Sequence, residues 1–238
     1  MNISVASYSS KGSRARNEDN ISLLAENRGG MIAVVADGLG GEGNGDAASL
    51  TTIKTMNARL SGSETTTENV EKAIISANDE IIKLQDKDNK MKSTIAVLCL
   101  NGTRAVAATV GDTRIYQFRR GKVLYQSTDH SVSQMSVSVG EINADKIRGH
   151  VDRHRLTRSL GSRKTVEADL TELVSGSGDA FLLCSDGFWE LILEEEMSED
   201  LGASKSADEW LNKMRDRIES RISPTGDNHS AIAIIVEV

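Results

Sequence analysis

Residues 95–118 carry the pattern that decides the fold: I-A-V-L-C-L-N-G-T-R-A-V-A-A-T-V-G-D-T-R-I-Y-Q-F. Three short apolar runs, Ile95–Leu100, Ala105–Val110 and Ile115–Phe118, follow one another with four residues between neighbours. A crossover connection between parallel strands needs a dozen or more residues, so these runs predict antiparallel strands. Because the runs are apolar on both faces, we expect two antiparallel sheets stacked as a sandwich.

Similar runs elsewhere extend this pattern. Further strands are predicted at Ile3–Ala6, Ile21–Ala25, Met31–Ala36, Phe181–Cys184 and Ile232–Val238. Helical periodicity predicts helices at about Asp46–Leu60 and Val70–Leu84, and a capping box at Ser206 and Glu209 opens a third through Ile218. The helices must cover the outer faces of the sheets, which gives an α+β fold, a four-layer αββα sandwich.

The whole chain is expected to form one domain. Its 238 residues fit a single large domain, so we assign residues 1–238 to one catalytic unit. The region 131–155 has weak periodicity and mixed charge, which indicates a mobile flap within that unit.

Composition excludes several classes of protein. The net charge of -7 leaves a nucleic-acid backbone little to bind. The longest apolar run, Ala231–Val236, is far shorter than the roughly 20 residues of a membrane helix. Met1–Ser10 lacks the pattern of a secretory signal, so we expect a cytoplasmic protein. We also expect the protein to be a monomer. Cys99 and Cys184 lie in apolar runs and are expected to be buried thiols.

Acidic residues gather at the predicted strand ends. Asp37, Asp112 and Asp186 follow strands, whereas Glu18-Asp19 and Asp227-Asn228 precede them. In antiparallel neighbours one strand begins where the next ends, so these carboxylates can meet at one sheet edge. A single Asp-Gly pair is most simply a turn.

Taken together, these acids indicate a cation site. Two carboxylates about 4 Å apart repel by roughly 4 kcal/mol at an effective dielectric near 20, so a cluster needs a compensating positive charge. Oxygen ligands without His or Cys select hard ions such as Mg²⁺ or Mn²⁺.

Seven stretches resemble an ordered family signature. They are R-A-R-N-E-D (14–19), V-A-D-G-L-G-G (35–41), V-G-D-T-R (110–114), T-D-H-S (128–131), R-S-L-G-S (158–162), S-D-G (185–187) and D-N-H-S-A (227–231). In order and spacing they resemble the metal-dependent protein phosphatases of type 2C, in particular their compact bacterial branch. The resemblance implies the same layered fold, with a binuclear Mg²⁺ or Mn²⁺ site at one edge.

The resemblance also implies ligands. Asp37 would bridge two tightly bound metals. Asp19, Asp186 and Asp227 would be further ligands or hold metal-bound waters, and Gly38 would offer its carbonyl. Asp112 matches a residue associated with a third, weaker ion, shared with Asp186; a structural turn is its alternative role.

Residues around the metals receive roles in the same way. Glu18 would order metal-bound waters, with Asn228 beside it in the second layer. Arg14 matches the family arginine that binds the substrate phosphate, a task for which a guanidinium is suited because it donates to two oxygens at once.

The implied reaction is hydrolysis of phosphoserine or phosphothreonine in proteins by a water held between the two metals. Asp37 and Asp186, with Arg14, would be the catalytic residues, and a Ser/Thr kinase would supply the substrates. Leu39 stands where some relatives have a histidine proposed as general acid, so leaving-group protonation would fall to a metal-bound water or an unidentified group.

Other features of the motifs are expected to be structural. His130 and His229 would order loops through hydrogen bonds. The glycines of residues 40–45 lack the Lys-Ser/Thr pair of a nucleotide-binding P-loop.

Two other functions are compatible with the pattern. One is a catalytically silent relative that serves as a regulatory module, although every matched acidic position is filled here. The other is a phosphohydrolase of small metabolites, which an assay comparing phosphopeptides with nucleotides separates from a protein phosphatase.

Overall fold

The computed structural model describes residues 2–26, 30–39 and 44–237. The strands are β1 (Ile3–Ser10), β2 (Asp19–Glu26), β3 (Gly30–Leu39), β4 (Lys92–Ser93), β5 (Ile95–Asn101), β6 (Arg104–Val110), β7 (Arg114–Arg119), β8 (Lys122–Gln126), β9 (Asp169–Val174), β10 (Asp179–Cys184) and β11 (His229–Val236). The helices are α1 (Gly45–Leu60), α2 (Thr67–Leu84), α3 (Val132–Ser138), the 3₁₀ helix η2 (Ala144–Gly149), α4 (Asp186–Trp189), α5 (Glu194–Gly202) and α6 (Ala207–Arg221).

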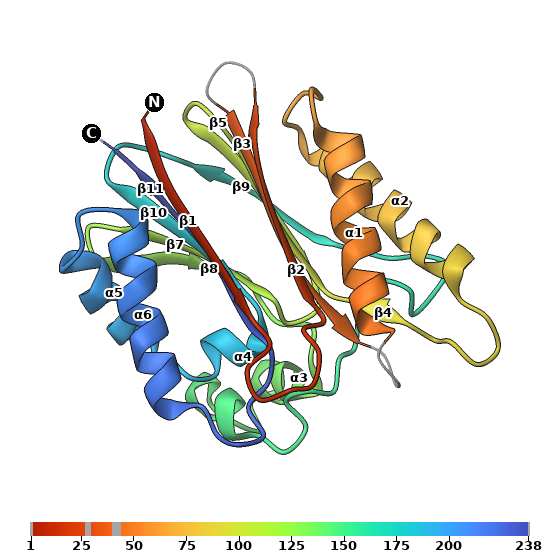
Figure 1. Cartoon of the computed structure of the whole chain (residues 1–238). Coiled ribbons are helices and arrows are strands. Elements are labelled where there is room, and N and C mark those ends of the chain that lie inside the picture. The colour runs from red at the N-terminus through yellow and green to blue at the C-terminus, as the bar shows by residue number, and fades with distance from the viewer. Residues whose placement is uncertain (1, 27–29, 40–43, 238) are drawn as a thin grey trace.

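Two antiparallel sheets pack face to face (Figure 1). The first sheet has the order β1-β11-β10-β7-β8, and the second has the order β2-β3-β5-β6-β9 with β4 paired to β3. Helices α5 and α6 cover the outer face of the first sheet, and α1 and α2 cover that of the second. The predicted αββα sandwich is confirmed.

The alternation of side chains on β5 explains why its sequence is continuously apolar. Ala96, Leu98 and Leu100 belong to the core between the two sheets. Val97 and Cys99 point the other way, into the core beneath α1 and α2. Burying each large aliphatic side chain contributes about 1.5–3 kcal/mol, so a central strand buried on both faces holds three layers together.

The predicted helices are present, with a change at the third. The Ser206 hydroxyl accepts a hydrogen bond from the Glu209 amide, as in a capping box. The Glu209 carboxylate, however, accepts from the amide of Lys205 rather than from that of Ser206.

Several elements were not predicted, and most of the predicted strands have wider bounds, as with β1, which runs to Ser10 instead of Ala6. The strands β8 and β9 lie at the outer edges of the two sheets, and helix α5 has a strongly acidic sequence. β3 runs on through Asp37-Gly38, which is therefore not a turn, and β11 begins at His229; the predicted strand end Val238 lies outside the described residues. The predicted flap, residues 131–155, contains α3 and η2.

One end of the sandwich gathers the connections that carry the acidic motifs. In Figure 1, α3 and α4 lie at the lower end, whereas β1 begins and β11 ends at the upper end. A search of the described helices finds none with the length and apolar character needed to cross a bilayer.

Candidate metal centre

Two aspartates face each other on neighbouring strands of the second sheet. Asp19, the first residue of β2, is the antiparallel partner of Asp37 near the end of β3. The strand continues because the Gly38 amide donates to the Glu18 carbonyl at 3.1 Å and Gly38 pairs with Ser93 of β4. Two carboxylates at directly opposite positions repel each other, so the strand pairing places two like charges side by side at this edge.

Three further aspartates lie at the same end of the sandwich. Asp112 follows β6, Asp186 begins α4 directly after β10, and Asp227 precedes β11. Burial raises the pKa of Asp37 well above its usual value, and the charges of Asp19, Asp186, Asp112 and Asp227 raise it further. We call these five aspartates the acidic edge.

Burial has the same effect on the other deeply placed members. It raises the pKa of Asp19 to about 7, although hydrogen bonds from Ser230 and Ser185 oppose the shift. Burial, followed by the charge of Asp186, also raises the pKa of Asp112 well above its usual value. Ionising these carboxyl groups together is therefore costly without a compensating positive charge.

The unsatisfied oxygen of Asp19 tests whether a cation fits. The Ser185 hydroxyl donates to Asp19 Oδ2 at 2.8 Å, but nothing within the described ranges donates to the buried Oδ1. A buried anionic oxygen without a partner is costly, and carboxylate oxygens suit Mg²⁺ and Mn²⁺. The residues of the acidic edge therefore fit hard divalent ions.

Gly38 is required by close backbone packing beside the edge. A Cβ atom on Gly38 would lie 2.0 Å from the Gly45 carbonyl oxygen, and one on Gly45 would lie 2.5 Å from that of Gly38. The start of α1 thus touches the end of β3, and only glycine permits this approach. The metal-ligand role of the Gly38 carbonyl stays a prediction.

Glu18 and Asn228 brace the chain that leads into β2. The Glu18 carboxylate accepts from the Gly45 amide at 3.1 Å, and burial raises its pKa. The Asn228 side chain accepts from the Glu18 amide at 2.8 Å and donates to the carbonyls of Lys11 and Arg16, each at 2.9 Å. Asn228 therefore positions this segment through the backbone, next to Asp227.

Arg14 lies at the rim of the edge. Its Nη2 donates to Asp227 Oδ2 at 2.8 Å, and its side chain is 56% exposed. A cationic fork that is accessible to solvent and adjacent to the acidic edge is well placed to meet an incoming anion.

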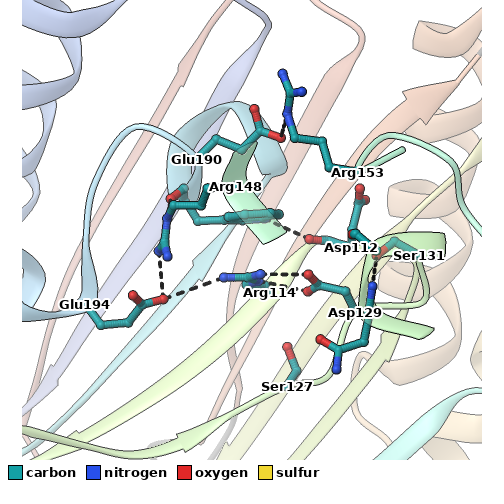
Figure 2. A network of polar contacts seen from close by, with 12 residues as sticks. Asp112, Arg114, Ser127, Asp129, Ser131, Arg148, Arg153, Glu190 and Glu194 are labelled. Atoms are coloured by element: carbon teal, nitrogen blue, oxygen red, sulfur yellow. Dashed lines mark hydrogen bonds and ion pairs between the residues drawn. The ribbon is translucent and has the colours of Figure 1, made fainter. Parts of the chain in front are cut away.

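A network of ion pairs around the buried Arg114 and Asp129 lies beside Asp112, one residue of the acidic edge (Figure 2). Arg114 donates to both carboxylate oxygens of Asp129, at 2.8 and 2.7 Å, and both side chains are at most 3% exposed. In Figure 2 Arg114 lies between Asp129 and Glu194, and Arg148 donates to Glu194 at 2.8 Å. We call Arg114, Asp129, Arg148 and Glu194 the ion network.

Trp189 connects this network to the edge. The Arg114 guanidinium lies over its indole ring, 3.4 Å from the ring centroid. The indole N–H donates to the backbone carbonyl of Asp112 at 2.9 Å. Because Trp189 and Asp186 belong to the same short helix, α4, the network fixes both aspartates relative to each other.

Comparison with known proteins identifies the family. The family model described as protein phosphatase 2C matches residues 8–225. The chain belongs to the protein phosphatase 2C family. It is accordingly a phosphoprotein phosphatase.

Relatives of this phosphatase come from several bacteria. Among them, the serine/threonine phosphatase stp of Listeria monocytogenes is 28% identical over 234 residues, covering 94% of this chain and 91% of the relative. A serine/threonine phosphatase structure from S. agalactiae is 26% identical with a TM-score of 0.88, covering 99% of this chain and 100% of the other.

A third neighbour bears on the metals. The catalytic domain of the serine/threonine protein phosphatase PstP, solved in complex with two manganese ions, is 26% identical with a TM-score of 0.85, and the match covers 99% of each chain.

The phosphatase has side chains beside the edge that the sequence analysis missed. His154 Nδ1 lies 3.3 Å from Asp186 Oδ2, and Arg153 donates to Glu190 at 2.8 Å. The hydrogen bond to Asp186 raises the pKa of His154, and burial raises that of Glu190 to about 6. The spacing of four residues between Asp186 and Glu190 is the available signal for Glu190; His154 lies in a segment without periodicity.

The two motif histidines hold loops. The Gly111 amide donates to His130 Nδ1 at 3.0 Å, and the His130 amide returns a bond to the Gly111 carbonyl at 2.8 Å. His229 Nδ1 and the Tyr8 hydroxyl are hydrogen-bonded at 2.8 Å. Of the glycine cluster at 40–45, residues 40–43 lie outside the described residues.

Proposed function

We propose that this phosphatase hydrolyses phosphoserine and phosphothreonine in proteins with two tightly bound Mn²⁺ or Mg²⁺ ions. The observation that carries the proposal is the acidic edge, in which the charges of neighbouring aspartates add to the upward pKa shifts of Asp37 and Asp19, and a buried Asp19 oxygen has no partner among the described residues. The serine/threonine phosphatases with similar sequences and the manganese complex of PstP support it.

The ligands follow from the edge. Asp37 would hold both ions, and Asp19, Asp186, Asp227 and the Gly38 carbonyl would complete the pair. A third, weaker ion would bind at Asp112 together with Asp186. When bound, such ions activate water as a nucleophile and neutralise charge on the phosphoryl oxygens.

Other residues would bind the substrate phosphate or hold the backbone that carries the metal ligands. Arg14, exposed at the rim beside Asp227, would bind phosphate oxygens with two donors at once. Asn228 and Glu18 would hold the chain that presents Asp19, since their hydrogen bonds fix the backbone there. Leu39 carries no transferable proton, so we assign the proton taken up by the leaving hydroxyl to water.

We also propose that residues 1–238 form one catalytic domain that acts as a cytoplasmic monomer on the products of a Ser/Thr kinase. The core shared by the two sheets, with Leu98, Phe181 and Ile232, supports a single unit. The mobility of residues 131–155 remains part of this proposal.

Rates on a panel of substrates test the function. With Mn²⁺, we expect turnover of phosphothreonine and phosphoserine peptides, low turnover of nucleotides, and loss of activity in excess chelator. Faster turnover of nucleotides would instead favour a phosphohydrolase of small metabolites. A folded protein that binds Mn²⁺ but hydrolyses none of these substrates would be a silent relative.

A further inference from the structure

Residues 157–167 form a surface loop whose backbone is fixed from beneath. The fully buried Asn78 of α2 accepts from the Gly161 amide at 2.8 Å and donates to the carbonyls of Arg163 and Lys164 at 3.1 and 3.3 Å. Gln85, directly after that helix, donates to the Gly161 carbonyl at 2.8 Å. The loop is thus held rigidly in place, which reduces the entropy lost when it binds a ligand.

The loop encloses a small polar cavity. Its volume is about 130 Å³, and it is lined by Thr157, Arg158, Ser159, Ser162, Arg163, Thr165, Val166 and Glu167. That volume is several times the roughly 30 Å³ that one water molecule occupies. The hydroxyls of Ser159 and Ser162 are hydrogen-bonded to each other, so the two groups lie at one point and one of them has its hydrogen free to donate to a ligand.

The loop is cationic in an acidic chain. The protein carries a net charge of -7. The loop, in contrast, has three basic residues, Arg158, Arg163 and Lys164, and one acidic residue, Glu167. Arg158 is engaged by Asp169 at 2.9 Å. The exposed guanidinium of Arg163 has no partner in the part of the chain that the structure describes. A guanidinium beside hydroxyl groups is a donor set for a tetrahedral oxyanion.

Two connections place the loop beside the acidic edge. Leu160 and Ser93 exchange backbone hydrogen bonds at 3.1 and 2.8 Å, and the Ser93 hydroxyl donates to the Asp37 carbonyl at 3.2 Å. On the other side, Arg158 contacts His130, which is bonded to Gly111 directly before Asp112. The loop therefore adjoins the edge, and the residues that line its cavity include none of the five aspartates.

We propose that the 157–167 loop is a second oxyanion site, in which Arg163 and the hydroxyls of Ser159 and Ser162 bind a phosphoryl group that is not hydrolysed. This inference rests on the proposed function: the phosphoryl group belongs to the substrate, a protein segment phosphorylated at two nearby residues. Free inorganic phosphate has the same chemistry, so the tests separate the two sources.

The first test measures oxyanion binding alone. Inorganic phosphate is titrated into the full chain in chelator while backbone amide resonances are followed by NMR. We expect saturable shifts at Ser162, Arg163 and Thr165. Arg163→Ala should weaken the apparent affinity at least about tenfold, since it removes a charge-assisted hydrogen bond.

Lys164→Ala is the matched control. It removes the same charge one residue away from a side chain that does not line the cavity, and screening should keep its effect below about twofold. No saturable shift, or equal weakening by both variants, would mean an adventitious ion only and overturn the proposal.

The second test identifies the source of the oxyanion. With Mn²⁺, kcat/KM is compared for peptides with one phosphate and with two. A preference for the second peptide of about tenfold or more, lost in Arg163→Ala and kept in Lys164→Ala, assigns the site to the substrate. Phosphate binding without such a preference assigns it to free phosphate. If no phosphopeptide is hydrolysed, the proposed function fails, while the NMR titration still decides the oxyanion site.

Discussion

The acidic edge and the ion network are neighbouring sets of charged groups, buried or half-buried, arranged in opposite ways. In the network, Arg114 forms two hydrogen bonds with Asp129 and Arg148 pairs with Glu194. In the edge, carboxylates face carboxylates, and cationic contacts lie at its rim, with Arg14 on Asp227 and His154 on Asp186.

The titration behaviour reflects this difference. Burial tends to raise the pKa of Glu194, but the hydrogen bond and charge of Arg148 outweigh it, so that the net shift is downward. Burial raises the pKa of Asp37 too, and there the neighbouring charges add to the shift. Paired charges can serve the fold alone, whereas an unpaired cluster of like charges indicates a ligand of the opposite sign.

The largest expected effect is on catalysis. Asp37→Asn should lower kcat on a phosphothreonine peptide by at least about a hundredfold while the protein stays folded, because it removes charge from the proposed metal bridge. Asp208→Asn, at an exposed position of α6, is the matched control and should have normal turnover. Near-normal kcat in Asp37→Asn would show that the edge is not catalytic.

The next prediction concerns stability, which substitutions in the ion network and in the acidic edge should change in different directions. Asp129→Asn should destabilise the metal-free protein by about 3–5 kcal/mol in urea unfolding, because it removes the carboxylate to which the buried Arg114 donates two hydrogen bonds. Asp37→Asn in the same chelated buffer should leave stability unchanged or raise it, since it relieves repulsion. Equal destabilisation by both variants would remove the distinction between network and edge.

A pH series sharpens the distinction. The pKa of Asp19 rises from 3.8 in the unfolded chain to about 7 in the fold, so the folded state binds more protons between these values. The contribution of Asp19 to the stability of the chelated protein should therefore be lost as pH rises from about 4 to about 7. Thermal melts measure this, and saturating Mn²⁺ should remove the loss. A fall unaltered in Asp19→Asn would assign it to other groups.

The smallest expected effect concerns the rim. Arg14→Ala should raise KM for a phosphopeptide about tenfold through loss of a charge-assisted phosphate contact, with little change in Mn²⁺ affinity. Arg14→Lys keeps the charge but loses the two-donor fork, and should restore only part of the affinity. An unchanged KM in Arg14→Ala would exclude the arginine from phosphate binding.

The sequence predicts the layers and the acidic edge well because both follow from strong local patterns. The apolar run at Ile95–Leu100 specifies a strand buried on both faces, and strand ends in an antiparallel sheet bring Asp19 to Asp37. The strand β8, K-V-L-Y-Q, is largely exposed at a sheet edge and therefore lacks that signal.

Other parts depend on tertiary contacts that have no local pattern. His154 meets Asp186 across 32 residues, and Trp189 meets Asp112 across 77. The prediction that Asp37-Gly38 ends its strand was wrong, because pairing of Gly38 with Ser93 extends β3. A turn-forming dipeptide cannot reveal a partner strand that lies far away in the sequence.

Calorimetric titration of the metal-free protein with Mn²⁺ tests the central claim most directly. We expect two tightly bound ions per chain and a third, weaker one that disappears in Asp112→Ala. Heats measured at pH 7 in buffers of different ionisation enthalpy should show proton release, because burial and like charge hold carboxyl groups such as Asp19 partly protonated. Tight binding of two ions with proton release is the predicted result; no saturable binding of Mn²⁺ or Mg²⁺ would contradict the account.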